Sequence, residues 1–183
     1  RSGLDLPVAV NLSARCAADP TLPGSVFALL AAADLPGSAL VVELTESVML
    51  GAAPDGRAQL ERLDAMGVRL VVDDFGTGYS SMSYLKQMPL NELKIDQTFV
   101  RKLTTIVDDQ RIVRSMIDLA HNFELHVVAE GVEDKPTMDM LQTMGCDVIQ
   151  GYYLAKPMPE ADFVKWCEDR AEMLRNKAVP AQA

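Results

Sequence analysis

Short apolar runs alternate with amphipathic runs along most of this chain, and this alternation is what most constrains its fold. The apolar runs are rich in Val, Leu and Ile and are often bounded by Gly or Pro, which is typical of strands covered on both faces. We expect strands at 8–12, 40–45, 69–74, 92–96, 126–130 and 147–152. We expect helices at 57–66, 109–121, 137–144 and 160–177. Strands that alternate with helices form a parallel sheet with right-handed crossovers, so the chain is predicted to be an α/β protein.

Polar side chains at the ends of the predicted strands favour a barrel over an open sheet. Each strand finishes on a polar group that a buried strand does not need: Asn11, Glu43, Asp73 with Asp74, Lys94, Glu130 and Gln150. In a β/α barrel, catalytic groups come from the C-terminal ends of several strands and converge on one mouth. A glycine-rich phosphate loop does not follow the first predicted strand, which weakens the case for a nucleotide-binding open sheet. The sequence therefore predicts a TIM-like β/α barrel with its site at the mouth.

The residue types at these strand ends indicate a metal site made of oxygen ligands. Carboxylate and amide oxygens at these strand ends, without His or Cys, suit Mg²⁺, Mn²⁺ or Ca²⁺ rather than zinc or iron. The adjacent Asp73 and Asp74 could reach two ions, an arrangement used for in-line displacement at phosphorus. Lys94 could orient a water or steady a phosphoryl oxygen. The alternative is a buried ion-pair network in which Lys94 pairs with a neighbouring carboxylate.

A glycine-rich and hydroxyl-rich segment, residues 74–81, follows the third predicted strand. Its glycines would let backbone N–H groups approach a phosphate or a neighbouring loop. A tight turn that caps the next helix through Ser80 or Ser81 explains the same residues equally well.

Charge and cysteine content exclude several classes of protein. Lys and Arg number 17 against 26 Asp and Glu, a net charge of −9. A sequence-blind nucleic-acid binder or a protein of anionic membrane surfaces needs basic patches, so we expect no DNA partner. The three cysteines are widely spaced, which argues against a disulfide scaffold and suits a reducing compartment. We therefore expect a cytoplasmic location, which could be the cytoplasmic part of a membrane-anchored protein.

Six motifs, in order from Val8 to about Pro159, resemble those of the EAL-domain family, the bacterial phosphodiesterases that open cyclic di-GMP. They are Asn11-Leu12-Ser13, Glu43-Leu44-Thr45-Glu46, Asp73-Asp74-Phe75-Gly76-Thr77-Gly78-Tyr79-Ser80-Ser81, Lys94-Ile95-Asp96, Ala129-Glu130-Gly131-Val132-Glu133 and Gln150-Gly151-Tyr152. The resemblance implies a β/α barrel that hydrolyses one phosphodiester bond of cyclic di-GMP to give linear pGpG. It also implies two metal ions, Mg²⁺ or Mn²⁺, with Ca²⁺ as an inhibitor.

The resemblance assigns roles to individual residues of the predicted mouth. The implied metal ligands are Asn11, Glu43, Asp73, Asp74 and Glu130, with Asp74 reaching the second ion. The implied catalytic residues are Lys94, which would bind the attacking water or the phosphate, Glu130, which would assist deprotonation of water, and Gln150, which would help to hold that water.

The resemblance also implies a link between the 74–81 loop and dimerisation. Glu133 would anchor this loop, in which Phe75, Gly76, Thr77 and Gly78 would couple metal binding to a homodimer interface. Ser80 and Pro157 would contact the substrate. Further signalling domains, such as GGDEF or sensory domains, are expected to be linked to this one in the full-length protein.

The chain departs from the family pattern at its N-terminal side. The family takes its name from Glu-Ala-Leu on the first barrel strand, whose glutamate is a metal ligand, and this sequence contains no Glu-Ala-Leu. We expect an incomplete barrel of about six βα units within residues 1–177, without the first strand and first helix, followed by a disordered tail at 178–183. It could be a trimmed piece of a phosphodiesterase, a chain completed by a partner, or a shortened relative without activity.

These considerations leave two functions of different classes. The first is a cyclic di-GMP phosphodiesterase domain, with this segment alone inactive or weakly active because one metal-binding carboxylate is missing. The second is a module that binds cyclic di-GMP without cleaving it, or that serves dimerisation or another protein interaction.

Overall fold

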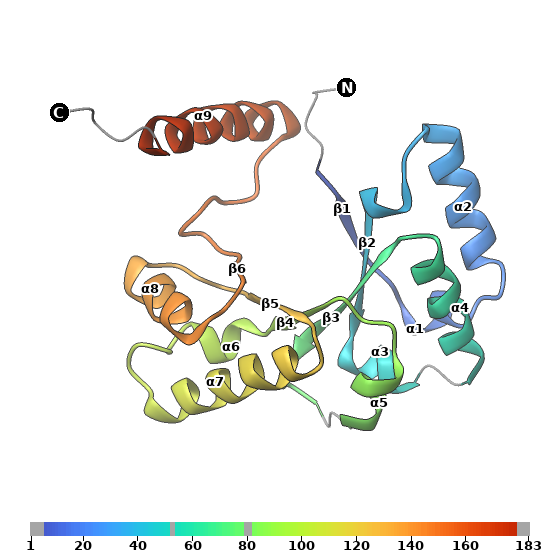
Figure 1. Cartoon of the computed structure of the whole chain (residues 1–183), viewed down its shortest axis with the longest axis horizontal. Coiled ribbons are helices and arrows are strands. Elements are labelled where there is room, and N and C mark those ends of the chain that lie inside the picture. Colours follow the sequence, from blue (N-terminus) through green and yellow to red (C-terminus); the bar gives the residue numbers. More distant parts are fainter. Residues whose placement is uncertain (1–5, 52–53, 79–81, 179–183) are drawn as a thin grey trace.

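The computed structural model describes residues 6–51, 54–78 and 82–178, which build a parallel six-stranded sheet in the order β1-β2-β3-β4-β5-β6 (Figure 1). All five neighbouring pairs are parallel. The strands are β1 Val8–Asn11, β2 Leu40–Thr45, β3 Arg69–Phe75, β4 Glu92–Ile95, β5 His126–Ala129 and β6 Val148–Ile149. The sheet curls into half of a barrel, with helices on its outer side, which confirms the predicted incomplete β/α barrel.

Helices connect the successive strands, and a further helix, α9, follows β6. They are α1 Ala14–Ala17, α2 Leu22–Ala33, α3 Glu46–Gly51, α4 Pro54–Ala65, α5 Met82–Gln87, α6 Gln97–Val100, α7 Val107–Asn122, α8 Lys135–Met144 and α9 Glu160–Ala178, with a short 3₁₀ turn at Gly37–Ala39. The predicted helices correspond to α4, α7, α8 and α9, and α9 includes Ala178, the first residue of the predicted tail. The rest of that tail, 179–183, lies outside the described residues. Among the described helices, none combines the length and the apolar character needed to cross a bilayer.

The two faces of the strands carry different chemistry because successive side chains point to opposite sides of a sheet. On the outer face, Leu44, Val72 and Ile95 are buried against the helices and belong to the hydrophobic core. From the helices, α4 contributes Leu63 and α7 contributes Ile117 to the same core. The positions in between face the inside of the curled sheet and include the charged residues described below. The core therefore holds the strands from outside and leaves the inner face free for polar groups.

The β1 edge of the half-barrel is rich in exposed apolar side chains. On β1, Val8 is 63% exposed and Val10 is 49% exposed. On the neighbouring α2, Phe27 is 63% exposed and Leu29 is exposed as well. An edge strand presents unpaired backbone groups that favour pairing with another strand. This edge therefore combines unpaired backbone groups with exposed apolar side chains.

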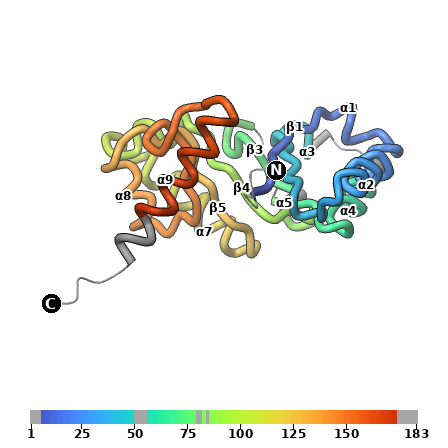
Figure 2. Tube along the Cα trace, turned by 90° about the horizontal axis from the view of Figure 1, so that it is seen from above, coloured from blue at the N-terminus to red at the C-terminus, as the bar shows by residue number. Residues whose placement is uncertain are grey.

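Helix α9 forms where it is predicted, but among its described side chains the apolar face is only partly buried and does not join the core cluster. Phe163 is exposed and stacks on Trp166, with 6.1 Å between the ring centroids. The guanidinium of Arg170 lies 5.3 Å from the centre of the Trp166 ring. Figures 1 and 2 place α9 on the β6 side of the molecule, away from α2. A helical stripe identifies an apolar face, but it does not identify the partner of that face.

Candidate metal and catalytic site

Lys94 lies at the centre of the inner face and contacts three carboxylates. Its Nζ is 3.0 Å from Glu43 Oε1, 3.0 Å from Asp73 Oδ1 and 2.7 Å from Glu130 Oε1. These acidic residues come from β2, from β3 and from the residue directly after β5. The Lys94 side chain is only 7% exposed. The structure thus brings together four of the residues that the sequence places at strand ends.

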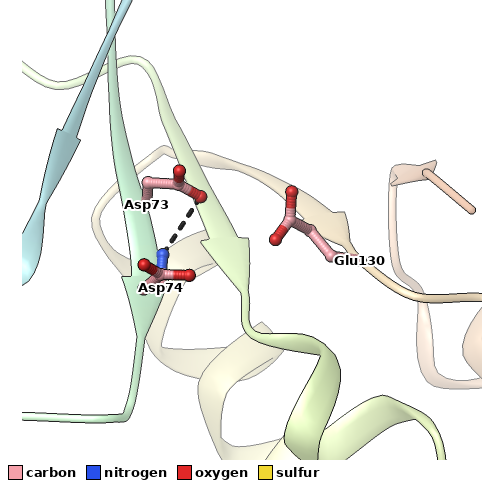
Figure 3. A group of neighbouring side chains, drawn as sticks. All are labelled: Asp73, Asp74 and Glu130. Atoms are coloured by element: carbon pink, nitrogen blue, oxygen red, sulfur yellow. Dashed lines mark hydrogen bonds between the residues drawn. The ribbon is translucent and has the colours of Figure 1, made fainter. Parts of the chain in front are cut away.

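Asp73 and Asp74 both contribute to this cluster although they are consecutive in β3 (Figure 3). In a regular strand, neighbouring side chains point to opposite faces. Here Asp74 has a left-handed backbone with φ of +55°, and the register with β4 shifts between Val72 and Phe75. Aspartate is one of the residues that tolerate this conformation. Asp73 Oδ1 also accepts a hydrogen bond from the Asp74 backbone N–H at 3.1 Å.

The residues present fit a hard divalent cation. One ligand oxygen each from Asp73, Asp74 and Glu130 lies within 4.8 Å of the others, and all three residues are half-buried. Carboxylate oxygens at this spacing are the donors that Mg²⁺ and Mn²⁺ prefer. Asn11 lies directly beside Glu43 in the β1–β2 register, at the exposed end of β1. The backbone of Asn11 is therefore next to that of Glu43, on the edge-strand side of the cluster.

Burial and neighbouring charges shift the pKa values of three groups in the cluster. Burial acts to lower the pKa of Lys94, but its contacts with Glu130, Glu43 and Asp73 raise this pKa above its ordinary value. Burial, together with the charge of Asp73, raises the pKa of Asp74. Burial also raises the pKa of Glu130 although Lys94 acts to lower it. The cluster holds one ammonium beside four carboxyl groups, so its ionised form carries an excess of negative charge.

Glu46 holds the glycine-rich loop after β3 through its backbone. Its side chain is buried, and Oε2 accepts hydrogen bonds from the N–H groups of Gly76 and Gly78, both at 3.3 Å. Since these N–H groups donate to Glu46, they are not directed at a phosphate in this structure. Oε1 of Glu46 is buried without a hydrogen-bond partner among the described residues. A sequence pattern could not reveal this role, because Glu46 lies 30 residues before the loop in the chain.

The other loop residues have defined places up to Gly78. Phe75 is buried in the core, and Gly76 has a φ of +98° with Met116 packed against it. Thr77 donates its hydroxyl to the Asp74 carbonyl at 2.9 Å, which closes a turn. Ser80 lies outside the described residues.

Glu133, expected to anchor this loop, forms an ion pair with Arg101 at 3.5 Å. Both side chains are about half exposed. The anchoring role of Glu133 stays a prediction, and Arg101 is a neighbour that the sequence motifs do not include.

A cavity of about 250 Å³ adjoins the carboxylate cluster. It is lined by side chains that include Glu130, Glu133, Gln150, Arg101 and Tyr152. Gln150, one residue after β6, therefore lies in the same hollow as Glu130. Pro157 is exposed in the segment between β6 and α9.

Asp96 is a further acidic residue near the cluster whose structural role was not expected. It is buried, and Oδ1 accepts hydrogen bonds from the Thr98 N–H at 2.9 Å and from the Thr98 hydroxyl at 2.5 Å. It thereby caps the N-terminus of α6. Its charge and a hydrogen bond also contribute to the raised pKa of Asp74. The position of Asp96 directly after β4 is the sequence signal that could have indicated its role as the cap of α6.

Comparisons with known proteins agree on one family. A model of the EAL domain matches residues 1–157. MucR of Pseudomonas aeruginosa, a "bifunctional diguanylate cyclase/cyclic di-GMP phosphodiesterase", is 44% identical over 155 residues, which are 85% of this chain and 23% of MucR. RocR of the same organism, a "cyclic di-GMP phosphodiesterase", is 35% identical over 165 residues, which are 90% of this chain and 42% of RocR. The chain thus spans less than half the length of these two relatives.

Solved structures give the same result. The PaMucR phosphodiesterase in complex with c-di-GMP superposes with a TM-score of 0.82 at 43% identity, covering 87% of this chain and 64% of that one. The EAL domain of Mycobacterium smegmatis DcpA superposes with a TM-score of 0.83 at 36% identity, covering 89% of this chain and 73% of that one. The matched family model and these likenesses together show that the chain belongs to the EAL domain family.

Proposed function

We propose that this chain is the larger part of a metal-dependent domain that hydrolyses cyclic di-GMP to linear pGpG. The observation that carries the proposal is the convergence of Glu43, Asp73 and Glu130 on Lys94, with Asp74 beside them. MucR and RocR, which are named as cyclic di-GMP phosphodiesterases, support this choice of substrate.

The carboxylates of the cluster, with the amide of Asn11, would hold Mg²⁺ or Mn²⁺. The consecutive Asp73 and Asp74 are the residues that could serve two ions. When bound, such ions supply charge stabilisation at the phosphoryl group and make water more acidic.

Three side chains at the mouth of the barrel would act on the attacking water and on the phosphoryl group. Lys94 would hold the attacking water or steady a phosphoryl oxygen. Glu130 would accept a proton from this water, because its raised pKa brings a carboxylate closer to the range of an effective base. Gln150, which lines the same cavity as Glu130, would orient the water.

The loop residues and the remaining predicted contacts complete the proposal. Glu133, with Phe75, Gly76, Thr77 and Gly78, would couple the site to a homodimer interface. Ser80 and Pro157 would contact the substrate.

We also propose that the domain functions in the cytoplasm and is linked to further signalling domains such as GGDEF, as the cyclase in the name of MucR suggests.

Product analysis would test this function. The chain is incubated with cyclic di-GMP and Mn²⁺ or Mg²⁺, and linear pGpG is measured by chromatography. We expect slow formation of pGpG, because the Glu-Ala-Leu carboxylate of the family is absent from this sequence. Glu43→Gln and Lys94→Ala should abolish the product, whereas Glu61→Gln on the exposed side of α4 should not. Replacement of Mg²⁺ by Ca²⁺ should suppress the formation of pGpG.

The same measurements separate the alternative functions. Tight binding of cyclic di-GMP by calorimetry, without any linear product, would favour a receptor. Absence of both binding and product would leave a dimerisation or interaction module. Full activity of Glu43→Gln would contradict the role given to that carboxylate.

A further inference from the structure

Lys94 has no hydrogen-bond donor to spare in the described structure. An ammonium group carries three N–H donors and no acceptor. Its Nζ lies 2.7–3.0 Å from three carboxylate oxygens, which belong to three different residues. In this arrangement Lys94 cannot also donate to a water or to a phosphate oxygen. The task proposed for Lys94 therefore requires that at least one of these contacts is broken first.

The oxygens that hold Lys94 belong to residues that would be needed by a cation. Asp73 and Glu130 contact Nζ, and both belong to the group whose ligand oxygens lie within 4.8 Å of one another. The same Asp73 oxygen, Oδ1, also accepts the N–H of Asp74. The Lys94 side chain is 7% exposed, so solvent screens its charge only weakly. An ammonium and a divalent cation therefore compete for the same carboxylates.

We propose that Lys94 is the resident counter-cation of the carboxylate cluster, and that a divalent metal must displace its ammonium from at least one of Glu43, Asp73 and Glu130. The displaced ammonium is then free to donate to the phosphate. Metal loading thus precedes the productive position of Lys94, and Lys94 limits the affinity of the site for metal. This inference rests on the proposed function, since it assumes that the cluster binds metal.

Replacing Lys94 by an uncharged residue should have two opposite effects. Without metal, three half-buried carboxylates lose their partner, so the protein becomes less stable. With metal, the divalent cation no longer meets a positive charge a few ångströms away, so it binds more tightly. A lysine that merely holds water or phosphate would not produce this increase in metal affinity.

The test compares Lys94→Met with Lys165→Met, a change of the same net charge at an exposed position on α9. Mn²⁺ affinity is measured by calorimetry, and thermal unfolding is followed with and without Mn²⁺. We expect Lys94→Met to melt at a lower temperature without metal and to bind Mn²⁺ about tenfold more tightly, because the repulsion between close charges is removed. Lys165→Met should match the unmodified chain in both measurements. Unchanged or weaker Mn²⁺ binding by Lys94→Met would overturn the proposal.

A measurement on the unmodified chain covers the case in which Lys94→Met does not fold. The ammonium resonance of Lys94 is followed by nuclear magnetic resonance during a titration with Mg²⁺. We expect it to shift in step with Mg²⁺ binding, and an unchanged resonance at saturation would overturn the proposal. If the unmodified chain binds neither Mg²⁺ nor Mn²⁺, the proposed metal site fails and this inference fails with it. Binding without the expected changes at Lys94 overturns only this inference.

Discussion

The carboxylate of Glu46 accepts the backbone N–H of Gly78 at 3.3 Å and so joins the start of α3 to the loop after β3. The same oxygen accepts the N–H of Gly76. Glu46 is 2% exposed, which makes these hydrogen bonds to a charged acceptor stronger than they would be in water. The conformation of the loop therefore depends on one buried side chain.

Replacing Glu46 should loosen this loop and destabilise the fold. Glu46→Ala removes both acceptor contacts and leaves two backbone N–H groups without their partner. We expect a loss of about 2 kcal/mol in the free energy of unfolding, measured in urea. Glu61→Ala, which breaks only the exposed pair with Arg57, should cost about 0.5 kcal/mol or less. Equal effects of the two changes would show that Glu46 does not hold the loop.

Glu92 should make the fold less stable as the pH rises. It faces the inside of the sheet on β4, and burial raises its pKa although Arg69, His126 and Lys94 act to lower it. A carboxyl whose folded pKa lies above its unfolded pKa favours folding at low pH. That contribution is lost as the pH rises from the unfolded pKa through the folded one.

Glu92→Gln should remove this dependence. We expect the variant to melt at a higher temperature than the unmodified chain at about pH 7, with a much smaller difference at about pH 4, where Glu92 is largely protonated. Glu61→Gln is the exposed control on α4. A difference that grows toward low pH would contradict the sign of the shift.

Asp147 should have the opposite pH dependence. It accepts hydrogen bonds from His121 Nε2 at 2.9 Å and from the Val127 N–H at 2.8 Å, which link α7 to β5. Burial acts to raise the pKa of Asp147, but these partners lower it below its ordinary value. A carboxylate with a lowered pKa stabilises the fold above its unfolded pKa, and this contribution disappears as the pH falls through the folded pKa.

Asp147→Asn should therefore lower the melting temperature at neutral pH and lose this effect in acid. Asp108→Asn is a suitable control, because Asp108 forms only an exposed pair with Arg111 on one helix. Scanning calorimetry over a pH series would measure both variants. An effect of Asp147→Asn that is constant with pH would exclude the assigned contribution of the charge.

Two large apolar residues on neighbouring helices should respond very differently to truncation. Leu63 on α4 is 0% exposed and belongs to the core, whereas Phe27 on α2 is 63% exposed. Leu63→Ala should cost about 3 kcal/mol of unfolding free energy because it leaves a cavity. Phe27→Ala should change this free energy by about 0.5 kcal/mol or less. A large loss with Phe27→Ala would mean that the α2 face is covered in solution, which sedimentation could then test.

The six strands and the helices α4, α7, α8 and α9 were predictable because their signals are local. A run such as 40–45, apolar and bounded by Pro and Gly nearby, carries the strand pattern within itself, and it is β2. Helix α2 escaped prediction because it is apolar almost all round, so it has no stripe that marks an inner face. The packing of α9 was not predictable, since the partner of Phe163 is not encoded in its own spacing.

The residues of the site also divide into those that the sequence could predict and those whose contacts depend on how the chain folds. Glu43, Asp73 and Lys94 could be predicted to meet, because the ends of parallel strands converge on one rim. The contact of Glu46 with Gly76 could not, because it depends on how the loop folds back over α3. The left-handed backbone of Asp74, which places two consecutive carboxylates in one cluster, was equally invisible in the sequence.

On β2 and β3 an apolar outer side lies opposite an inner side that carries Glu43 and Asp73, and this separates the chemistry of the site from the packing of the fold. Leu44 and Val72 keep the helices in place, while their neighbours Glu43 and Asp73 take no part in that packing. An EAL protein can therefore lose its reaction through a few substitutions and still look native in its circular dichroism spectrum. Whether a folded relative is active should be judged from the atoms that line the mouth of its barrel, because its overall similarity to an enzyme does not depend on them.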